Sequence, residues 1–359
     1  MGLSKTAKNS LLDKAPKSSV THRSIAKKYL SKANKTAFPE NIKPMLATLV
    51  KEPFDDENWL FEIKWDGYRA LALLRNGVVN LNSRNNLSFN KKFHPVAAAL
   101  KAWDINAILD GEIVALNDDG MADFQLLQAW QKTGEGKLIY YIFDILWLDG
   151  YSTLDIPLIE RKALLKSVIR QNKIIRYSDH ILERGEDFFV LALKKGIEGI
   201  MAKKTASTYH PDTRTKEWLK IKTQHRQETV IAGFTEGRGS RSHFGALVLG
   251  VYKNKELIYV GHTGSGFDER TLKEVYRKLK PLVTRECPFE QEPKTKMPVT
   301  WVKPVLVCEI RFQEWTRDHS LRHPIFMGLR EDKKATEVRR ETEINTSKVV
   351  KAKAKKPEK

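Results

Sequence analysis

Charged side chains interrupt several apolar stretches of this sequence, and they are the residues best suited to chemistry. Lys64 follows Phe61 and Ile63, and Lys220 and Lys222 alternate with apolar neighbours. An unpaired charge is costly to bury, so charges in such positions should meet one another or a ligand. The full group is Glu62, Lys64, Asp66, Arg69, Asp110, Glu112, Glu198, Lys220 and Lys222.

These residue types together suit the transfer of a phosphoryl or nucleotidyl group. A lysine becomes a nucleophile near neutral pH when desolvation or neighbouring cations lower its pKa. Carboxylates on facing strands can hold Mg²⁺, which takes few protein ligands and adds substrate phosphate oxygens. Two lysines on one strand face can hold a phosphate. We therefore predict that Lys64 attacks an α-phosphate, although each element taken alone could be a solvated charged face.

Other familiar sites are absent from the sequence. Residues 134–138 lack the first Gly and the Ser/Thr of a phosphate-binding loop, and no G-x-G-x-x-G motif occurs. His319 and His323 lack the glutamate of an H-E-x-x-H zinc motif. The pattern around Lys64 therefore carries the functional prediction.

The stretch around Lys64 predicts a strand, a turn at Gly67 and a second strand over residues 68–74. If the first strand continues to Asp66, then Glu62, Lys64 and Asp66 share one face, because strand side chains alternate with period two.

The rest of the first two thirds mixes strand and helix patterns without a regular βαβ repeat. Asn76-Gly77 predicts a hairpin, because both turn positions tolerate positive φ. These patterns predict a mainly antiparallel α+β domain over residues 41–222. Its further strands are expected at residues 78–82, 107–116, 138–148, 198–203 and 218–222, and its helices at 89–100, 124–130, 159–169 and 187–193.

Beyond a polar hinge at residues 223–227 the pattern changes to short strands with Gly or Asn-Lys turns. A small closed β-barrel of the OB-fold type is predicted over residues 228–343. Its strands are expected at residues 229–234, 246–252, 257–261 and 305–312, with one helix at 269–280.

The net charge is +19 over 359 residues, and much of it lies at the two ends. Residues 1–40 and 344–359 are expected to be basic, flexible extensions. A basic body with basic ends suits a polyanion, most simply nucleic acid, although charged ends can also serve solubility alone. The N-terminal extension could be a linker remnant or a DNA-binding arm.

Composition also narrows the class of protein. No run of 18 apolar residues occurs, so no membrane association is expected. Cys287 and Cys308 are the two cysteines, which excludes a disulfide scaffold and fits a reducing cytosol. We therefore expect a cytoplasmic protein.

Residues 64–69, Lys-Trp-Asp-Gly-Tyr-Arg, are similar to the K-x-D-G-x-R motif of the covalent nucleotidyltransferases, which comprise DNA ligases, RNA ligases and mRNA capping enzymes. Residues 321–333 resemble the R-x-D-K ending of ATP-dependent DNA ligases. With residues 44–47 and 236–241, they most resemble the ligase domain of bacterial ligase D, an end-joining ligase. The intervening motifs of the family are matched by residues 83–84, 110–112, 141–144, 198–203 and 220–222.

The resemblance implies a DNA ligase that uses ATP and a divalent metal, Mg²⁺ or Mn²⁺. Lys64 would take AMP from ATP, AMP would pass to the 5′-phosphate of a nick, and the 3′-hydroxyl would displace it. By motif, Glu62 would contact the adenine, Arg69 the ribose, and Phe143 would stack on the base. Arg84 would contact phosphate or ribose.

The remaining motif positions imply roles around the phosphates. Glu112 would serve the ribose and the metal, Glu198 the metal, and Asp66 the metal or the nick. Arg330 and Lys333 would orient the pyrophosphate once the barrel closes over ATP. The ATP phosphates would be approached by Lys203, Lys220 and Lys222.

The implied substrate is nicked or broken double-stranded DNA, with Ku and a repair polymerase as further candidate partners. The resemblance also implies a monomer that associates with the bacterial nucleoid. Double-strand break repair by end joining is the leading role, and general nick repair is the alternative. An RNA ligase, a capping-type enzyme and a non-enzymatic DNA-binding protein are the remaining alternatives.

Overall fold

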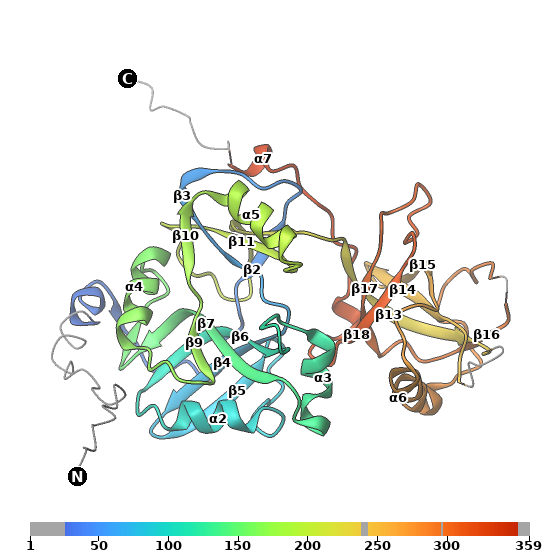
Figure 1. Ribbon diagram of the computed structural model, residues 1–359, viewed down its shortest axis with the longest axis horizontal. Helices are drawn as coiled ribbons and strands as arrows, with labels where there is room; N and C mark the ends of the chain where they lie inside the picture. The colour runs from blue at the N-terminus through green and yellow to red at the C-terminus, as the bar shows by residue number, and fades with distance from the viewer. Residues whose placement is uncertain (1–25, 238–242, 296, 351–359) are drawn as a thin grey trace, which may run out of the picture.

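The structure, a computed structural model, describes residues 26–237, 243–295 and 297–350. Figure 1 shows two lobes: a larger lobe that ends at Lys222 and a smaller barrel lobe that begins at Arg226. The expected basic ends fall largely on residues 1–25 and 351–359, which lie outside the described residues.

The first sheet of the larger lobe has seven strands in the order β1-β8-β7-β6-β4-β5, with β9 added beside β7. Its core is closed by helices α2 (His94–Lys101), α3 (Phe124–Thr133) and α4 (Leu158–Val168). The strands are β1 (Asn34–Lys35), β4 (Tyr68–Arg75), β5 (Val78–Ser83), β6 (Ala107–Leu116), β7 (Lys137–Leu148), β8 (Tyr151–Ser152) and β9 (Ile175–Tyr177).

The second sheet has five strands in the order β10-β3-β11-β12-β2, and helix α5 (Gly185–Lys194) packs on β3 and β11. Leu60 and Trp218 of this sheet pack with Leu71 and Ile108 of the first sheet, so one apolar cluster joins the two sheets. Its strands are β2 (Leu46–Leu49), β3 (Asp56–Ile63), β10 (His180–Glu183), β11 (Gly199–Lys204) and β12 (Arg214–Lys222).

The barrel lobe is a six-stranded sheet in the order β15-β14-β13-β17-β18, with β16 beside β13. Helix α6 (Glu269–Leu279) begins at Asp268, whose side chain accepts a hydrogen bond from the backbone N–H of Thr271. Strands β16 (Val299–Trp301) and β18 (Ile325–Leu329) were not predicted. The predicted strands are β13 (Arg226–Thr235), β14 (Leu247–Lys253), β15 (Glu256–Thr263) and β17 (Val307–Arg311).

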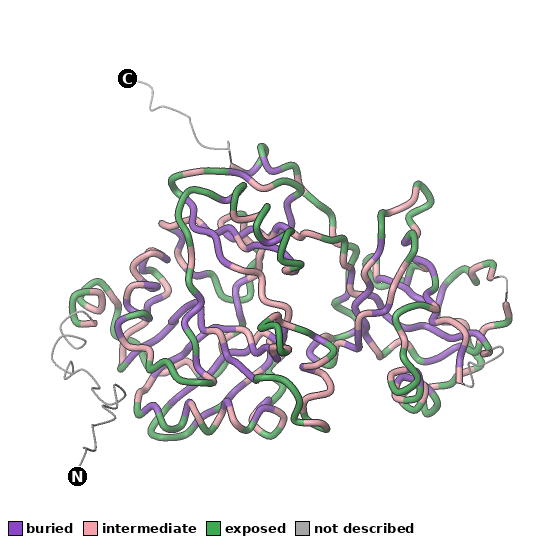
Figure 2. The backbone as a smooth tube through the Cα atoms, in the orientation of Figure 1, coloured by how far each residue is buried: buried purple, intermediate pink, exposed green. Residues whose placement is uncertain are grey.

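The predicted α+β class is confirmed, because all strand pairs except β2–β12 and β7–β9 are antiparallel. The β4–β5 hairpin turns at Asn76 and Gly77, whose φ angles of 51° and 74° fit a two-residue hairpin loop. Figure 2 shows the buried backbone concentrated in the sheets of both lobes. Among the described residues, no helix is both long and apolar enough to cross a membrane.

The local prediction around Lys64 needs one correction. Strand β3 ends at Ile63, and β3 and β4 belong to different sheets. Residues 64–67 therefore form a crossing between two sheets and not the tip of a hairpin. The premise that the strand continues to Asp66 is therefore wrong, although Glu62, Lys64 and Asp66 all line one cleft.

The described parts of the expected flexible ends are packed on the larger lobe. Residues 26–30 are helical, and Tyr29 and Leu30 pack against the first core. At the other end, helix α7 (Ser347–Val350) buries Val349 beside β3 and β12. The apolar residues scattered among the lysines, which composition alone does not reveal, account for this packing.

Candidate active site

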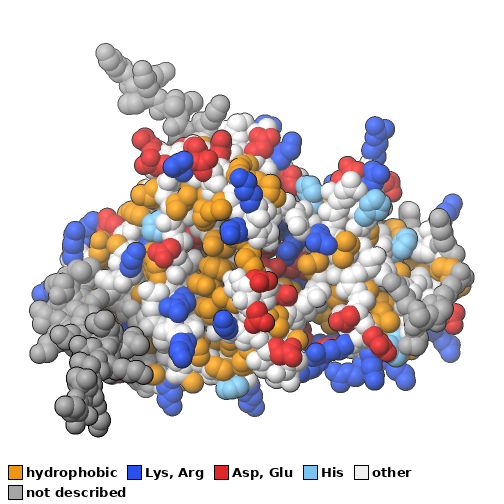
Figure 3. Space-filling view, viewed as in Figure 1, with side chains coloured by type: hydrophobic (Ala, Val, Ile, Leu, Met, Phe, Trp, Pro, Cys, Tyr) orange, Lys and Arg blue, Asp and Glu red, His pale blue; other side chains and the backbone are white. Residues whose placement is uncertain are grey.

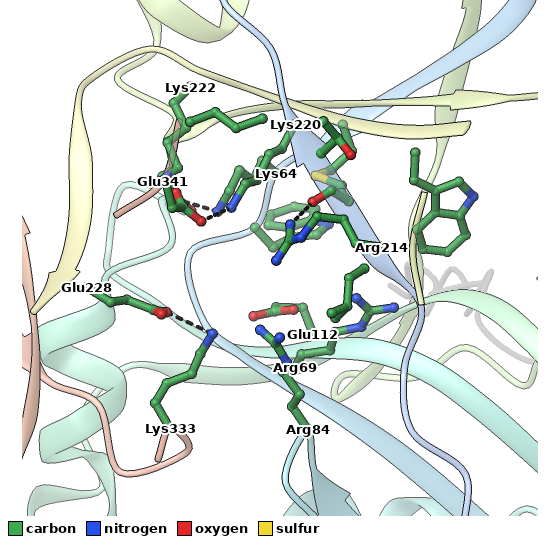
Figure 4. A pocket seen from close by; sticks show the side chains of 18 of the residues that line it. Lys64, Arg69, Arg84, Glu112, Arg214, Lys220, Lys222, Glu228, Lys333 and Glu341 are labelled. Atoms are coloured by element: carbon green, nitrogen blue, oxygen red, sulfur yellow. Dashed lines mark hydrogen bonds and ion pairs between the residues drawn. The ribbon is translucent and has the colours of Figure 1, made fainter. Parts of the chain in front are cut away.

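A cleft of about 770 Å³ lies between the two lobes and contains the charged residues singled out from the sequence. Figure 3 shows a hollow between the lobes with basic side chains inside it. In Figure 4, Lys64, Lys220 and Lys222 lie on one wall, Arg69, Arg84 and Glu112 lie on the opposite wall, and Lys333 reaches in from the barrel side.

One end of the cleft combines aromatic rings with a buried charge cluster. Both oxygens of the Glu62 carboxylate are occupied, one by the Lys162 ammonium and the other by Lys203 Nζ at 2.6 Å. Burial opposes ionisation of Glu62, but the two ammonium groups outweigh it and lower its pKa. The Lys203 Nζ also lies 4.2 Å from the Phe143 ring and 4.1 Å from the Trp218 ring.

This arrangement differs from the role expected for Lys203. The sequence placed Lys203 at the ATP phosphates, whereas its ammonium is buried against Glu62 among the aromatic rings. Burial lowers the pKa of Lys203, and Glu62 acts against that effect. Because β3 and β11 are adjacent strands, they place Lys203 and Glu62 on the same buried face.

Lys64 lies immediately after β3 with its Nζ 2.5 Å from a Glu198 carboxylate oxygen. The backbone N–H of Lys64 donates to the carbonyl of Gly199 at 3.0 Å, which brings the lysine beside the residue that precedes β11. Burial opposes ionisation of Glu198, but Lys64 and Arg226 together lower its pKa. Glu198 therefore holds the amine of Lys64 at the centre of the cleft.

Arg69 is fixed by the carboxylate of Asp110, a member of the predicted charged group to which the sequence assigned no role. Its guanidinium donates to both oxygens of Asp110, at 3.0 and 2.6 Å, and to the Met45 carbonyl at 2.7 Å. The Tyr209 hydroxyl also donates to Asp110. Three of the five N–H donors of Arg69 are thus engaged, and the other two are available to a ligand.

Glu112 lines the cleft, and its carboxylate makes no hydrogen bond or ion pair within the part of the chain that the structure describes. Burial raises the pKa of Glu112 to about 8, against the opposing effect of Lys64 and Arg69. A carboxylate left without a protein cation fits a metal ligand, because a divalent cation would supply the missing positive charge.

The other two expected metal ligands already have cationic partners, Lys64 for Glu198 and Arg226 Nη1 for Asp66, the latter at 2.7 Å. Burial and the nearby Glu198 raise the pKa of Asp66 to about 6. Within residues 26–350, leaving aside the masked positions, no group of three or more His, Cys, Asp or Glu side chains is arranged to hold a metal. A cation here would need substrate oxygens as well.

Lys220 and Lys222 project from β12 toward one carboxylate, that of Glu341. Lys222 Nζ lies 2.8 Å from a Glu341 oxygen and also donates to the Arg226 carbonyl at 2.9 Å. Burial lowers the pKa of Lys220 to about 8, although Glu341 opposes that shift. The structure therefore brings the two lysines together as predicted and adds an anion between them.

The barrel contributes Arg330 and Lys333 to the cleft, as the sequence predicted. Arg330 pairs with both oxygens of Asp332 at 2.9 Å and with Glu309 at 3.0 Å, and Lys333 pairs with Glu228 at 2.8 Å. Arg84 lines the same cleft without an ion pair inside the described portion of the chain, and burial lowers its pKa.

The sequence prediction missed several partners of these groups: Lys162, Trp218, Arg226, Glu309 and Glu341. Asp110 was in the predicted charged group, but its pairing with Arg69 was not predicted. Lys162 lies on α4, which was predicted only as a helix over residues 159–169, so nothing in the local pattern singled it out. No local signal marked Glu341, because its partners are about 120 residues away in the chain.

Two family models match the chain. An ATP-dependent DNA ligase domain matches residues 44–222, and an ATP-dependent DNA ligase C-terminal region matches residues 240–333. The Pseudomonas aeruginosa multifunctional non-homologous end joining protein LigD is 39% identical over 313 residues, which are 85% of this chain and 37% of that protein. The chain thus spans well under half the length of this relative, and it covers a similar share, 41%, of LigD from Mycolicibacterium smegmatis.

Two further similarities concern proteins that the chain covers more fully. The SPbeta prophage-derived DNA ligase-like protein LigB of Bacillus subtilis is 32% identical over 197 residues, which are 72% of that protein and 54% of this chain. A solved structure of mycobacterial DNA ligase D complexed with ATP and MES is 34% identical, with a TM-score of 0.64. The match covers 84% of this chain and 99% of that one. This chain therefore belongs to the ATP-dependent DNA ligases and is of the ligase D type.

Proposed function

We propose that the chain seals 5′-phosphate/3′-hydroxyl breaks in DNA through a covalent lysyl-AMP on Lys64. The observation that supports this best is the position of Lys64. Its amine is held by Glu198 in a cleft that has an aromatic end beside Phe143 and a strongly cationic end beside Lys222. This layout matches a nucleotide, whose base is apolar and whose phosphates are anionic.

In the first step, the Lys64 ammonium gives a proton to the Glu198 carboxylate, which lies 2.5 Å away, and the freed lone pair of the nitrogen forms a bond to the α-phosphorus of ATP. The bond from that phosphorus to the bridging oxygen breaks, and the nitrogen loses its second proton to the departing pyrophosphate or to solvent. Pyrophosphate leaves with the electron pair of that bond. Glu198 orients the amine, and Lys220 and Lys222 balance the negative charge of the α-phosphate. Arg330 and Lys333 face the same cleft from the barrel, where they would orient the departing pyrophosphate.

In the second and third steps, the 5′-phosphate of DNA takes AMP from Lys64, and the 3′-hydroxyl then forms the phosphodiester bond and releases AMP. Residues 41–222 would perform nucleotidyl transfer, and the OB-type barrel of residues 228–343 would turn about residues 223–227 to hold DNA.

The base end requires a revised assignment. Both oxygens of Glu62 are taken by lysines, so we propose that Glu62 serves the adenine side by positioning Lys203, which lines the cleft with it. Phe143 and Trp218 provide the aromatic surfaces for the base. Arg69 keeps two free N–H donors for the ribose, and Arg84 faces the ribose and phosphates.

Membership of the family implies a divalent metal. Glu112, with Glu198 beside Lys64, would hold it, and when bound it would supply positive charge at the ATP phosphates. Either Mg²⁺ or Mn²⁺ fits such carboxylate and phosphate ligands. Asp66 is paired with Arg226 of the barrel lobe, so we propose that it contacts the nick or responds to movement of the barrel rather than binding the metal.

The test is transfer of label from α-³²P-ATP to the protein. We expect the wild type to become labelled and Lys64→Ala to stay unlabelled, because the described structure places no other amine beside Glu198. Lys51→Ala, an exposed lysine, serves as the control. Labelling of Lys64→Ala on another residue would refute the assignment, and labelling by α-³²P-GTP alone would indicate a capping-type enzyme.

The biological role proposed is end joining, with Ku and a repair polymerase as partners. The support is the similarity to the end joining proteins named LigD. Sealing of nicked and cohesive-ended DNA with and without Ku is the test. Efficient sealing of nicks combined with indifference to Ku on broken ends would favour general nick repair.

A further inference from the structure

The last described segment, residues 339–350, crosses from the barrel back to the larger lobe, and we call it the strap. Figure 1 shows it as the red chain that runs from beside β18 to α7, next to β3 and α5. The strap lines the mouth of the cleft with Arg339, Arg340, Glu341, Thr342 and Ile344. The strap is therefore part of the wall of the cleft in which a nucleotide would reach Lys64.

The backbone of the strap is fixed on both sides of the cleft. On the barrel side, the backbone N–H of Glu341 donates to the Gln227 side chain at 2.9 Å. On the other side, Ile344 N–H donates to the Leu49 carbonyl at 3.0 Å, and Thr346 exchanges hydrogen bonds with Glu52. The position of Glu341 is thus set by the fold.

The Glu341 side chain occupies the donors that the proposed mechanism assigns to phosphate. One of its oxygens pairs with Lys220 and the other with Lys222. Burial opposes ionisation of Glu341, but the charges of the two lysines outweigh it and hold its pKa well below the usual range. A carboxylate resembles a phosphate oxygen pair in charge and in hydrogen-bond acceptance, so the two compete for the same ammonium groups.

We propose that the Glu341 carboxylate competes with ATP: it occupies the phosphate-binding lysines Lys220 and Lys222, and the ATP phosphates must displace it. This inference rests on the proposed function, because it takes Lys220 and Lys222 as ligands of the ATP phosphates. Displacement has a cost, because the apparent dissociation constant for the nucleotide equals the intrinsic constant divided by the fraction of molecules in which the lysines are free of Glu341. Because the backbone on either side of Glu341 is held by hydrogen bonds, ATP would displace the carboxylate by rotation of the Glu341 side chain alone.

The first experiment measures single-turnover self-adenylation against ATP concentration. Glu341→Gln keeps the size of the side chain and removes its charge, so the half-saturating ATP concentration should fall by about three- to tenfold. The limiting rate should change by less than about twofold. Glu343→Gln is the matched control, because Glu343 lies on the strap but pairs with His225. Lys222→Ala should raise the half-saturating ATP concentration, because it removes a proposed phosphate ligand.

A second measurement needs no catalysis. Calorimetric titration with tripolyphosphate should show tighter binding by Glu341→Gln than by the wild type, with Glu343→Gln unchanged. Glu341→Ala repeats both measurements if the Gln variant melts early. Unchanged or weaker binding in the Glu341 variants would overturn the proposal and make Glu341 a residue that only positions the lysines. Absence of label in the wild type would instead count against the lysyl-AMP mechanism, while the titration would still test the competition.

Discussion

Individual charges in the cleft differ in whether the protein itself neutralises them. Glu62, Glu198 and Glu341 each face a lysine at hydrogen-bonding distance, and their pKa values are lowered. Glu112 has only the more distant effects of Lys64 and Arg69, and its pKa is raised to about 8. A group kept protonated in this way is typical of a site prepared for a cation that arrives with the substrate.

Glu112 gives a prediction about stability and pH. Its pKa is about 8 in the folded state and 4.5 ordinarily, so between these values the folded chain holds a proton that the unfolded chain has lost. The free energy of unfolding should therefore fall as pH rises from 4.5 to 8. Glu112→Gln should remove that fall and be more stable than the wild type at pH 8.5 by about 1–3 kcal/mol.

Thermal or urea unfolding at pH 5 and pH 8.5 measures this difference. Glu57→Gln on the exposed surface is the control and should follow the wild type. The same Glu112→Gln variant should adenylate itself more slowly, because it lacks the carboxylate proposed for the metal. Equal pH dependence in Glu112→Gln and the wild type would contradict the proposed environment of Glu112.

Sequence reasoning could identify these charged residues but not all of their partners. The alternation of Lys220 and Lys222 with apolar residues predicted a shared face, and they do meet one anion. The pattern could not show that Lys203 would turn to Glu62, because that contact depends on the pairing of β3 with β11. Long-range strand order, and not local spacing, decides which charges meet.

At the level of strands and turns, local signals worked where a turn had its own sequence requirement. Asn76-Gly77 specified the β4–β5 hairpin. Gly67 was interpreted in the same way, but it serves a crossing between sheets. A side chain there would meet the Ile113 carbonyl oxygen at 2.2 Å, so Gly67 is required for close packing against β6. Both glycines give the same turn signal, and their different roles depend on tertiary structure.

This contrast predicts different consequences for two similar substitutions. Gly67→Ala should cost about 1–3 kcal/mol of stability, because backbone must shift to admit the methyl group. It should also reduce self-adenylation by about tenfold or more, since the crossing carries Lys64 and displacement of reacting atoms is costly.

Gly77→Ala is the matched control. It faces open space, so its cost should come from its φ of 74° alone, about 1 kcal/mol. Urea unfolding and α-³²P-ATP labelling measure the two effects, and Gly77→Ala should keep full labelling. Normal labelling of a folded Gly67→Ala would show that the crossing tolerates movement.

Across the whole molecule, the barrel is docked with its Arg330 and Lys333 facing the cleft. Ion pairs join the lobes, including Arg226 with Asp66 at 2.7 Å and Lys92 with Glu331 at 2.9 Å. The motif order in the sequence predicted that both lobes would contribute to one site. It could not predict the docking itself, because each of these charged residues, taken alone, has the pattern of an ordinary solvent-exposed residue. The docked arrangement suits the proposed first step, in which Arg330 and Lys333 would orient the pyrophosphate.

The docked barrel predicts a separation of the reaction steps. Lys333→Ala removes a cation that faces the cleft, so it should slow self-adenylation by about tenfold or more. Sealing of DNA that already carries AMP should change by less than about threefold, because that step is proposed to need the barrel turned toward DNA.

Arg330→Ala should act in the same direction but also lose stability, since Glu309 and Asp332 would be left without their partner. Single-turnover assays of each step measure the two rates, and Lys303→Ala, exposed on the barrel, is the control. Equal losses of rate in self-adenylation and in sealing would mean that Arg330 and Lys333 stay in the cleft throughout the reaction, and would contradict the prediction.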